Sequence, residues 1–243
     1  MHLVLAVTVR AQSAAHGVRE TNAAVNVVEI FNAHVLPELQ APDLAARPIV
    51  KAGAIKFAST FRNQLPVETV RQLMPLLGNH LAAEQVVLHT YAAACIERFL
   101  GAKDGGAAGG APKFGRAELR PFLQPLVAAL FALVEKAEQE NEYVMKAIMR
   151  ALSVAEGDVM PVTGEVLAKI KAALARVCAN PRNPRFNHFL FESIAVLVRA
   201  VCGQDGGHVG AFEDALFPPF QTVLQMDVAE FTPCVFQALA RRG

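Results

Sequence analysis

The sequence predicts an all-α protein, and three observations lead to this fold class. Pro and Gly interrupt the 243 residues at spacings of helical length, and strand-like alternation of apolar and polar residues is scarce. Apolar residues instead recur every three or four positions, as on one side of a helix. The clearest stripes are Val27, Phe31, Val35, Leu39, then Val162, Val166, Ile170, Leu174, Val177, then Phe186, Leu190, Ile194, Leu197, Val201.

Breakers between these stripes divide the chain into successive helices. They include residues 41–43, 157–158, 180–184 and 203–207, each of which can end one helix and begin the next. Asp227, followed by Glu230, has the arrangement of an N-cap with a reciprocal acceptor and marks a late helix start. We expect ten helices, near residues 23–39, 47–62, 67–79, 83–100, 116–136, 141–156, 158–178, 185–202, 208–225 and 228–240.

The ten helices pair into five hairpins, one per about 44 residues, which is the period of HEAT-type repeats. A HEAT-type helical solenoid is therefore the expected architecture. The first helix of each pair carries a proline, which bends a helix so that it can wrap its partner. The alternative is that the helix ends are misplaced by a few residues. These prolines are Pro37, Pro75, Pro125, Pro161 and Pro218.

The Gly/Ala-rich segment Gly101–Gly115 is expected to be a flexible loop between the second and third hairpins. No Gly-Lys-Ser/Thr follows it, so a phosphate-binding loop is not indicated. The expected organisation is a remnant of a preceding repeat over 1–22, two hairpins over 23–100, this loop over 101–115 and three hairpins over 116–243.

Composition argues for a soluble protein that binds other proteins. A formal net charge of +1 without any basic block argues against nucleic-acid binding. The longest apolar run, Leu126–Val134, is shorter than the roughly 20 residues that span a bilayer, and no secretory signal is recognisable. The four cysteines share no CxxC spacing, so neither zinc nor a disulfide framework is indicated and the cytosol or the nucleus is the expected compartment.

No pattern in the sequence indicates an enzyme, and no cofactor or metal is expected. His188 and Glu192 are four residues apart but lack a third ligand, and none of the serines lies in a G-x-S-x-G context. A solenoid buries its apolar faces between neighbouring repeats and offers long surfaces instead of one deep pocket. Such surfaces bind proteins.

Several segments resemble the central part of the CAS exportins, members of the importin-β superfamily. They are Phe61–Gln64, His89–Ala93, Asn141–Arg150 and Phe186–His188, in the order and spacing of that family. The flanks agree in kind, from Leu3-Val4 to Val235–Gln237, so the resemblance extends over nearly the whole chain.

The resemblance implies a non-catalytic nuclear export receptor that carries importin-alpha to the cytoplasm together with Ran-GTP. It also implies shuttling between nucleus and cytoplasm and contact with nuclear pore proteins. Family members are much longer, so we expect this chain to correspond to an internal, central portion. Two alternatives stay open: a helical-repeat scaffold with another protein partner, and a truncated gene product without function.

Six polar residues are candidates for partner contact, because they lie in the segments of strongest resemblance and because second helices line the inner surface in this superfamily. The alternative is structural: Asn63 caps a helix, Lys146 and Arg150 form a solvated helix face, and His188 packs at a helix start. The candidates are Arg62, Asn63, Lys146, Arg150, His188 and Glu192.

Overall fold

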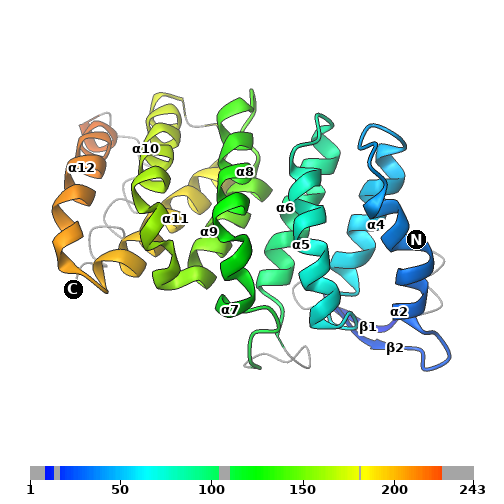
Figure 1. Cartoon of the computed structure of the whole chain (residues 1–243). Coiled ribbons are helices and arrows are strands. Elements are labelled where there is room, and N and C mark those ends of the chain that lie inside the picture. Colours follow the sequence, from blue (N-terminus) through cyan, green and yellow to red (C-terminus); the bar gives the residue numbers. More distant parts are fainter. Residues whose placement is uncertain (1–8, 14–16, 104–109, 181, 226–243) are drawn as a thin grey trace. The chain divides into compact units, whose positions relative to one another are not determined.

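The computed structural model describes residues 9–13, 17–103, 110–180 and 182–225 of the chain. Within this part the chain is almost entirely helical, which confirms the predicted fold class (Figure 1). Two compact units are distinguished by their internal contacts, residues 1–118 and residues 119–243. Because each unit forms its own core, the two are treated separately below.

Unit 1 begins with a β-hairpin that the sequence did not predict. β1 (Val9–Ser13) and β2 (Gly17–Thr21) pair antiparallel, with register shifts between Val9 and Ala11 and between Ala11 and Gln12. Each strand has only five residues. In β1 the residues VRAQ alternate apolar and polar, which is the shortest pattern that indicates a strand, and GVRET in β2 does not alternate. So short a signal did not outweigh the helical pattern of the rest of the chain.

The first helical hairpin of unit 1 matches the predicted helices 23–39 and 47–62. Its first arm is α2 (Val27–Ile30), a π-helical turn η1 (Phe31–Val35) and α3 (Leu36–Gln40), and its second arm is α4 (Pro48–Thr60). The side chain of Asn26 caps α2 by accepting a hydrogen bond from the Glu29 amide at 3.1 Å.

The second helical hairpin consists of α5 (Val67–Leu81) and α6 (Val86–Leu100). The second helices of the two hairpins, α4 and α6, lie side by side, and the Arg98 guanidinium donates to the Ser59 hydroxyl at 2.9 Å. Three phenylalanine rings pack against one another in the core. The ring centroids of Phe31 and Phe57 lie 6.5 Å apart, and those of Phe57 and Phe61 lie 4.6 Å apart. Unit 1 is thus two stacked repeats with a small sheet added.

Unit 2 continues the same pattern of helical hairpins. After α7 (Arg116–Leu119) and the 3-10 turn η3 (Arg120–Phe122), α8 (Leu123–Lys136) pairs with α9 (Glu142–Ala155). The turn η4 (Glu156–Val162) and α10 (Thr163–Ala179) pair with α11 (Pro184–Cys202). The turn η5 (Gly206–His208) and α12 (Val209–Gln225) follow. The predicted helix 228–240 and its cap at Asp227 and Glu230 lie outside the described residues.

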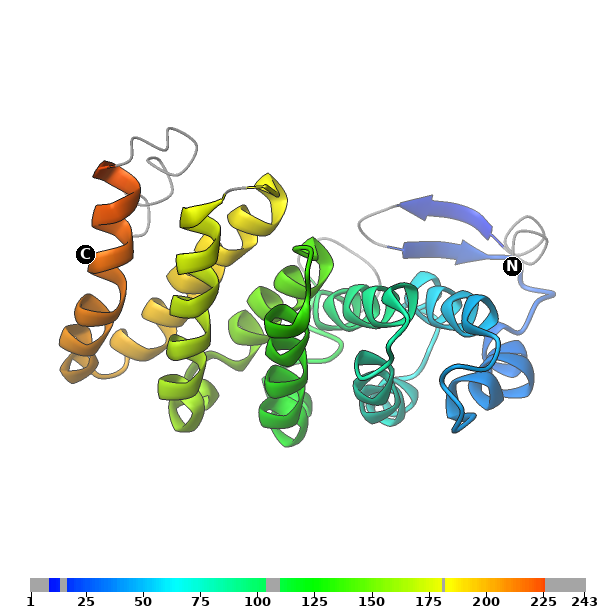
Figure 2. The same cartoon turned by 90° about the horizontal axis from the view of Figure 1, so that it is seen from above.

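The helices of unit 2 form two layers. In Figures 1 and 2, α8, α10 and α12 form one row, and α9 and α11 lie behind them. Asn183 Nδ2 donates to the carbonyl of Glu140, 43 positions earlier, and Arg176 Nη2 donates to the carbonyl of Val134, 42 positions earlier. These separations match the predicted repeat of about 44 residues, because equivalent positions of stacked repeats become neighbours.

The prolines of the first helices lie either inside an α-helix or beside a change of helix type. Pro75 and Pro218 lie inside α5 and α12, as predicted. Pro161 lies in η4, whereas Pro37 and Pro125 lie in the first turn of α3 and α8, directly after η1 and η3. Proline clashes with the carbonyl four residues earlier, and a π or 3-10 turn relieves that clash.

By length and composition alone, one helical stretch in the described residues, Arg116–Lys136, could cross a membrane. Its apolar side chains Leu126, Leu130 and Phe131 are buried in this structure, where α8 packs on α9. The same composition is therefore typical of a core helix in a hairpin repeat.

Candidate partner-binding surface

The six candidate residues fall into two groups, one in each unit. Arg62 and Asn63 lie in the turn between α4 and α5 of unit 1. Lys146 and Arg150 lie on α9, and His188 and Glu192 lie on α11, all in unit 2. The two groups have different surroundings.

Arg62 is buried, with 4% of its surface exposed. Its guanidinium Nη1 donates to the carbonyl of Ser59 at 2.8 Å, which places a cation at the C-terminal end of α4, where the helix dipole favours it. Burial and the neighbouring Arg98 guanidinium both lower the pKa of Arg62. The Arg62 side chain therefore packs in the interior of unit 1.

Asn63 and its neighbour Gln64 hold the β-hairpin. Asn63 Nδ2 and Gln64 Nε2 both donate to the carbonyl of Val18, each at 3.0 Å, and the Val18 side chain is fully buried. Gly17 has a positive φ of 73°, and a Cβ there would lie 2.5 Å from Arg62 Nη1, so a side chain at position 17 would displace the guanidinium. The side chain of Asn63 therefore binds β2.

The four candidates of unit 2 lie on two adjacent helices. Lys146 Nζ lies 5.6 Å from the ring centroid of Phe189, within the range of a cation–π interaction. The His188 ring, which is exposed, meets the same phenylalanine edge-on at 5.2 Å between centroids. Lys146, Arg150 and Glu192 are half-buried, and the Nε atom of the Arg150 guanidinium is itself buried.

Residues that the sequence did not single out complete this surface. Arg185 Nη1 forms an ion pair with Glu142 Oε1 at 3.1 Å, with exposed side-chain fractions of 76% and 22%, and Tyr143 is 44% exposed. We refer to the accessible residues of the two helices as the α9–α11 face. It comprises Glu142, Tyr143, Lys146 and Arg150 on α9, and Arg185, His188, Phe189 and Glu192 on α11.

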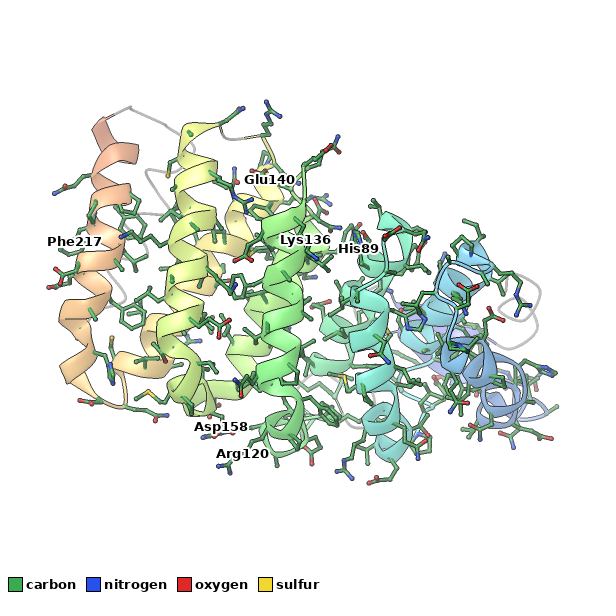
Figure 3. All side chains as sticks on the ribbon, turned by 45° about the horizontal axis from the view of Figure 1, so that its top comes forward. His89, Arg120, Lys136, Glu140, Asp158 and Phe217 are labelled. Atoms are coloured by element: carbon green, nitrogen blue, oxygen red, sulfur yellow. The ribbon has the colours of Figure 1, made fainter. Side chains whose placement is uncertain are left out.

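At the N-terminal end of this face lies the turn between Lys136 and Glu140, both labelled in Figure 3. Burial raises the pKa of the Glu140 carboxyl, although the hydrogen bond from Asn183 and the charges of Arg176 and Arg182 act in the opposite direction. Asn141 and Asn183 cap α9 and α11 with their side-chain oxygens. These caps fix the residues at which α9 and α11 begin, and hence which side chains of the two helices lie opposite one another.

Among the described residues, no three His, Cys, Asp or Glu side chains gather where they could hold a metal ion. His188 and Glu192 lie one turn apart on α11. Burial raises the pKa of the Cys95 and Cys178 thiols, which keeps them protonated and weakly nucleophilic.

Comparison with family models gives two adjoining matches. A model described as CAS/CSE protein, C-terminus, matches residues 97–241, and a model described as Cse1 matches residues 1–96. The chain belongs to the CAS/CSE family. The resemblance inferred from Phe61–Gln64 and the other segments is thereby confirmed.

The relatives of this CAS/CSE chain carry the name Exportin-2. The protein from Oreochromis niloticus is 41% identical over 241 residues, that from Drosophila melanogaster 40% and that from Homo sapiens 39%. Each match covers 99% of this chain and 24% of the relative, so the chain spans about a quarter of their length.

A solved structure described as "The exportin Cse1 in its cargo-free, cytoplasmic state" matches with a TM-score of 0.80 and 31% identity. The match covers 98% of this chain and 24% of that one. It confirms the predicted HEAT-type architecture of this CAS/CSE chain.

Proposed function

We propose that this CAS/CSE chain is a non-catalytic part of a nuclear export receptor that carries importin-alpha from the nucleus to the cytoplasm together with Ran-GTP. The observation that carries the proposal is the identity of 39% to 41% with proteins named Exportin-2, sustained over 241 residues. The proposed receptor shuttles between the two compartments and meets nuclear pore proteins on its way.

Stacked hairpins support a binding role more than a catalytic one. Each helix of unit 2 uses its apolar side for contact with neighbouring repeats, which leaves rows of polar and aromatic residues at the surface. We therefore assign this chain a role in binding protein partners. In this proposal GTP hydrolysis takes place on Ran.

The α9–α11 face is the proposed contact for a protein partner. Lys146, Phe189 and Tyr143 combine a cation with two aromatic rings that are partly accessible, and aromatic side chains, tyrosine among them, are enriched where protein interfaces gain most of their energy. The capped starts of α9 and α11 present these residues on rigid helices, which lowers the conformational entropy lost on binding. Arg62 and Asn63 lie outside this proposed contact. Their side chains form hydrogen bonds within unit 1.

The test is a pull-down of purified importin-alpha by the full chain, with and without Ran locked in its GTP state. Stronger capture in the presence of Ran-GTP supports the proposal, and no capture by a chain shown to be helical by circular dichroism contradicts it. Capture of importin-alpha that Ran-GTP leaves unchanged favours a scaffold over an export receptor.

The face itself is tested by a double variant, Lys146→Ala with Phe189→Ala. Loss of this cluster is expected to weaken importin-alpha binding at least tenfold, as for a central interface residue pair. Lys171→Ala is the control, because Lys171 is an exposed lysine of the same unit on α10, outside the face. Equal binding by the double variant and the control would place the contact elsewhere.

A further inference from the structure

The second helices of unit 1, α4 and α6, carry all the large apolar side chains that are exposed in the described part of this unit. Ile49 and Val50 on α4 are 74% and 51% exposed, and Val86 and Tyr91 on α6 are 67% and 36% exposed. All four belong to the first half of their helix. Single exposed apolar residues are normal at a protein surface, whereas a group of them on adjacent helices indicates an interaction site.

The two helices lie side by side and run in the same direction. The Arg98 guanidinium, near the end of α6, donates to the hydroxyl of Ser59, near the end of α4, at 2.9 Å. Because α4 and α6 are in contact and their C-terminal ends lie together, their N-terminal ends lie together as well. His89, labelled in Figure 3, belongs to the first turn of α6 at this end.

Helical spacing places the exposed residues of each helix on one side of it. Gly53 and Lys56 follow Ile49 by four and seven positions on α4, and Tyr91 follows Val87 by four positions on α6. We refer to this surface as the α4–α6 face. It comprises Ile49, Val50, Gly53 and Lys56 on α4, and Val86, Val87, Thr90 and Tyr91 on α6.

Gly53 leaves an open position on this face. A Cβ at residue 53 would meet no atom within 4 Å, although the residue lies inside α4. Glycine in the interior of a helix is less favourable than alanine, so packing within the chain does not account for it. Glycine does allow a second surface to approach the helix backbone closely. The open position therefore indicates that another molecule contacts α4 here.

Two opposite charges border the face. Lys56 lies on α4 beyond Gly53, and Glu84 is exposed in the turn directly before α6. Within the described parts of the chain, neither of these two side chains forms an ion pair. Arg47, the cation beside the start of α4, already pairs with Glu38 at 2.8 Å. Lys56 and Glu84 are therefore available to charges on another molecule.

We propose that the α4–α6 face binds the same face of a second copy of this chain across a two-fold axis. In such a contact each pair of facing residues occurs twice. Because α4 and α6 run parallel, a two-fold axis perpendicular to both helices reverses the order of residues along the face. It brings Lys56, far along α4, opposite Glu84 of the second copy, which lies before α6. The face is thus complementary to itself in charge.

The same symmetry makes the face complementary to itself in shape. Val86, which projects from the start of α6, faces the open position at Gly53 of the second copy. Ile49, at the start of α4, faces Tyr91, which lies further along α6. The contact removes all four large apolar side chains of each copy from water, and this burial is its driving force.

Sedimentation equilibrium of the full chain measures the mass of the assembly. We expect a concentration-dependent dimer with twice the 26.1 kDa of one chain. Lys56→Glu and Glu84→Lys each place like charges opposite one another in both halves of the contact, and each should weaken the dimer about tenfold. Lys171→Glu, the same change at an exposed lysine of α10 in unit 2, is the control and should leave the dimer unchanged. A chain that stays monomeric at every concentration overturns the proposal, as does a dimer that neither variant weakens.

An equal mixture of the two charge variants tests the pairing itself. In a mixed dimer, the glutamate introduced in one chain faces the lysine introduced in the other, and the unchanged Lys56 and Glu84 face each other. We therefore expect the mixture to recover the dimer that each variant alone has lost. A mixture that associates no better than either variant overturns the proposal.

The open position is tested by Gly53→Leu, whose side chain would fill the space assigned to Val86 of the second copy. Gly78→Leu is the matched control, because Gly78 also lies inside a helix of unit 1, on α5, and a Cβ there would also meet no atom within 4 Å. Leucine favours helix more than glycine does, so both variants should keep their helical circular dichroism. Gly53→Leu should weaken the dimer about tenfold and Gly78→Leu should leave it unchanged. Equal association of these two variants overturns the proposal.

Discussion

Asn187 on α11 offers the sharpest test of how unit 2 is stabilised. It is 3% exposed, and among the residues that the structure describes neither its Nδ2 nor its Oδ1 has a hydrogen-bond partner. A buried polar group without a partner costs about 1–3 kcal/mol of stability. Asn187→Leu keeps the branching and the number of heavy atoms and removes both polar atoms.

The expected gain follows from two opposing terms. Removal of the buried amide recovers about 1–3 kcal/mol, and fitting two methyl groups into a packed site costs up to about 1.5 kcal/mol. We therefore expect unit 2 to become about 1 kcal/mol more stable towards unfolding. The variant tests whether α11 carries this amide at a net cost to the fold.

Urea unfolding followed by tyrosine fluorescence measures the effect on unit 2 alone. The chain has no tryptophan and two tyrosines, Tyr91 in unit 1 and Tyr143 in unit 2, so a Tyr91→Phe background leaves only the reporter of unit 2. Asn141→Leu, an identical change at a capping residue, is the control and is expected to lose about 1 kcal/mol, because it removes the N-cap of α9. A loss of stability in Asn187→Leu would refute the reasoning.

Three further changes have expected outcomes. Burial lowers the pKa of His80 below 6.5, assisted by Lys51 and opposed by the hydrogen bond between the His80 Nδ1 and the Leu76 carbonyl, so unit 1 should be most stable above pH 6.5 and lose stability as the pH falls below it. Urea midpoints at pH 7.5 and 5.5 in a Tyr143→Phe background, which leaves only Tyr91 of unit 1 as reporter, check this, and His80→Gln should abolish the difference. Phe57→Ala, which removes two ring contacts from the core, should destabilise unit 1 by about 3–5 kcal/mol in urea unfolding with a Tyr143→Phe background, where Tyr91 reports on unit 1. Arg185→Gln should change the stability of unit 2 by less than about 1 kcal/mol, since that ion pair is exposed, and a larger loss would show that the pair fixes α9 against α11.

Most of the helical architecture was predictable, because the features that specify it are local. The stripe Phe186–Val201 predicts a helix over 185–202, and α11 extends over Pro184–Cys202 with Asn183 as its cap. The Pro and Gly breakers act within a few residues of themselves, so the turns after α3, α10 and α11 also lie where the sequence places them.

The candidate site was only partly predictable. Lys146 and His188 are brought to one phenylalanine, but the sequence did not indicate Phe189, since an aromatic residue in a helix is equally typical of a core. Arg62 looked like a surface residue and is buried, because the hairpin and Arg98 enclose it. No pattern in the few residues around Phe189 or Arg62 indicates these surroundings.

The sequence alone determined the class of fold, the repeat of about 44 residues and the family, because helix periodicity, breakers and family segments are all properties of short stretches of chain. Only the tertiary structure decided which side of each helix meets its neighbour, that β1 and β2 form a hairpin, and that Asn63 binds Val18 across 45 positions. These depend on contacts between residues distant in sequence. Their energies arise only when repeats are stacked, and no local pattern reports them.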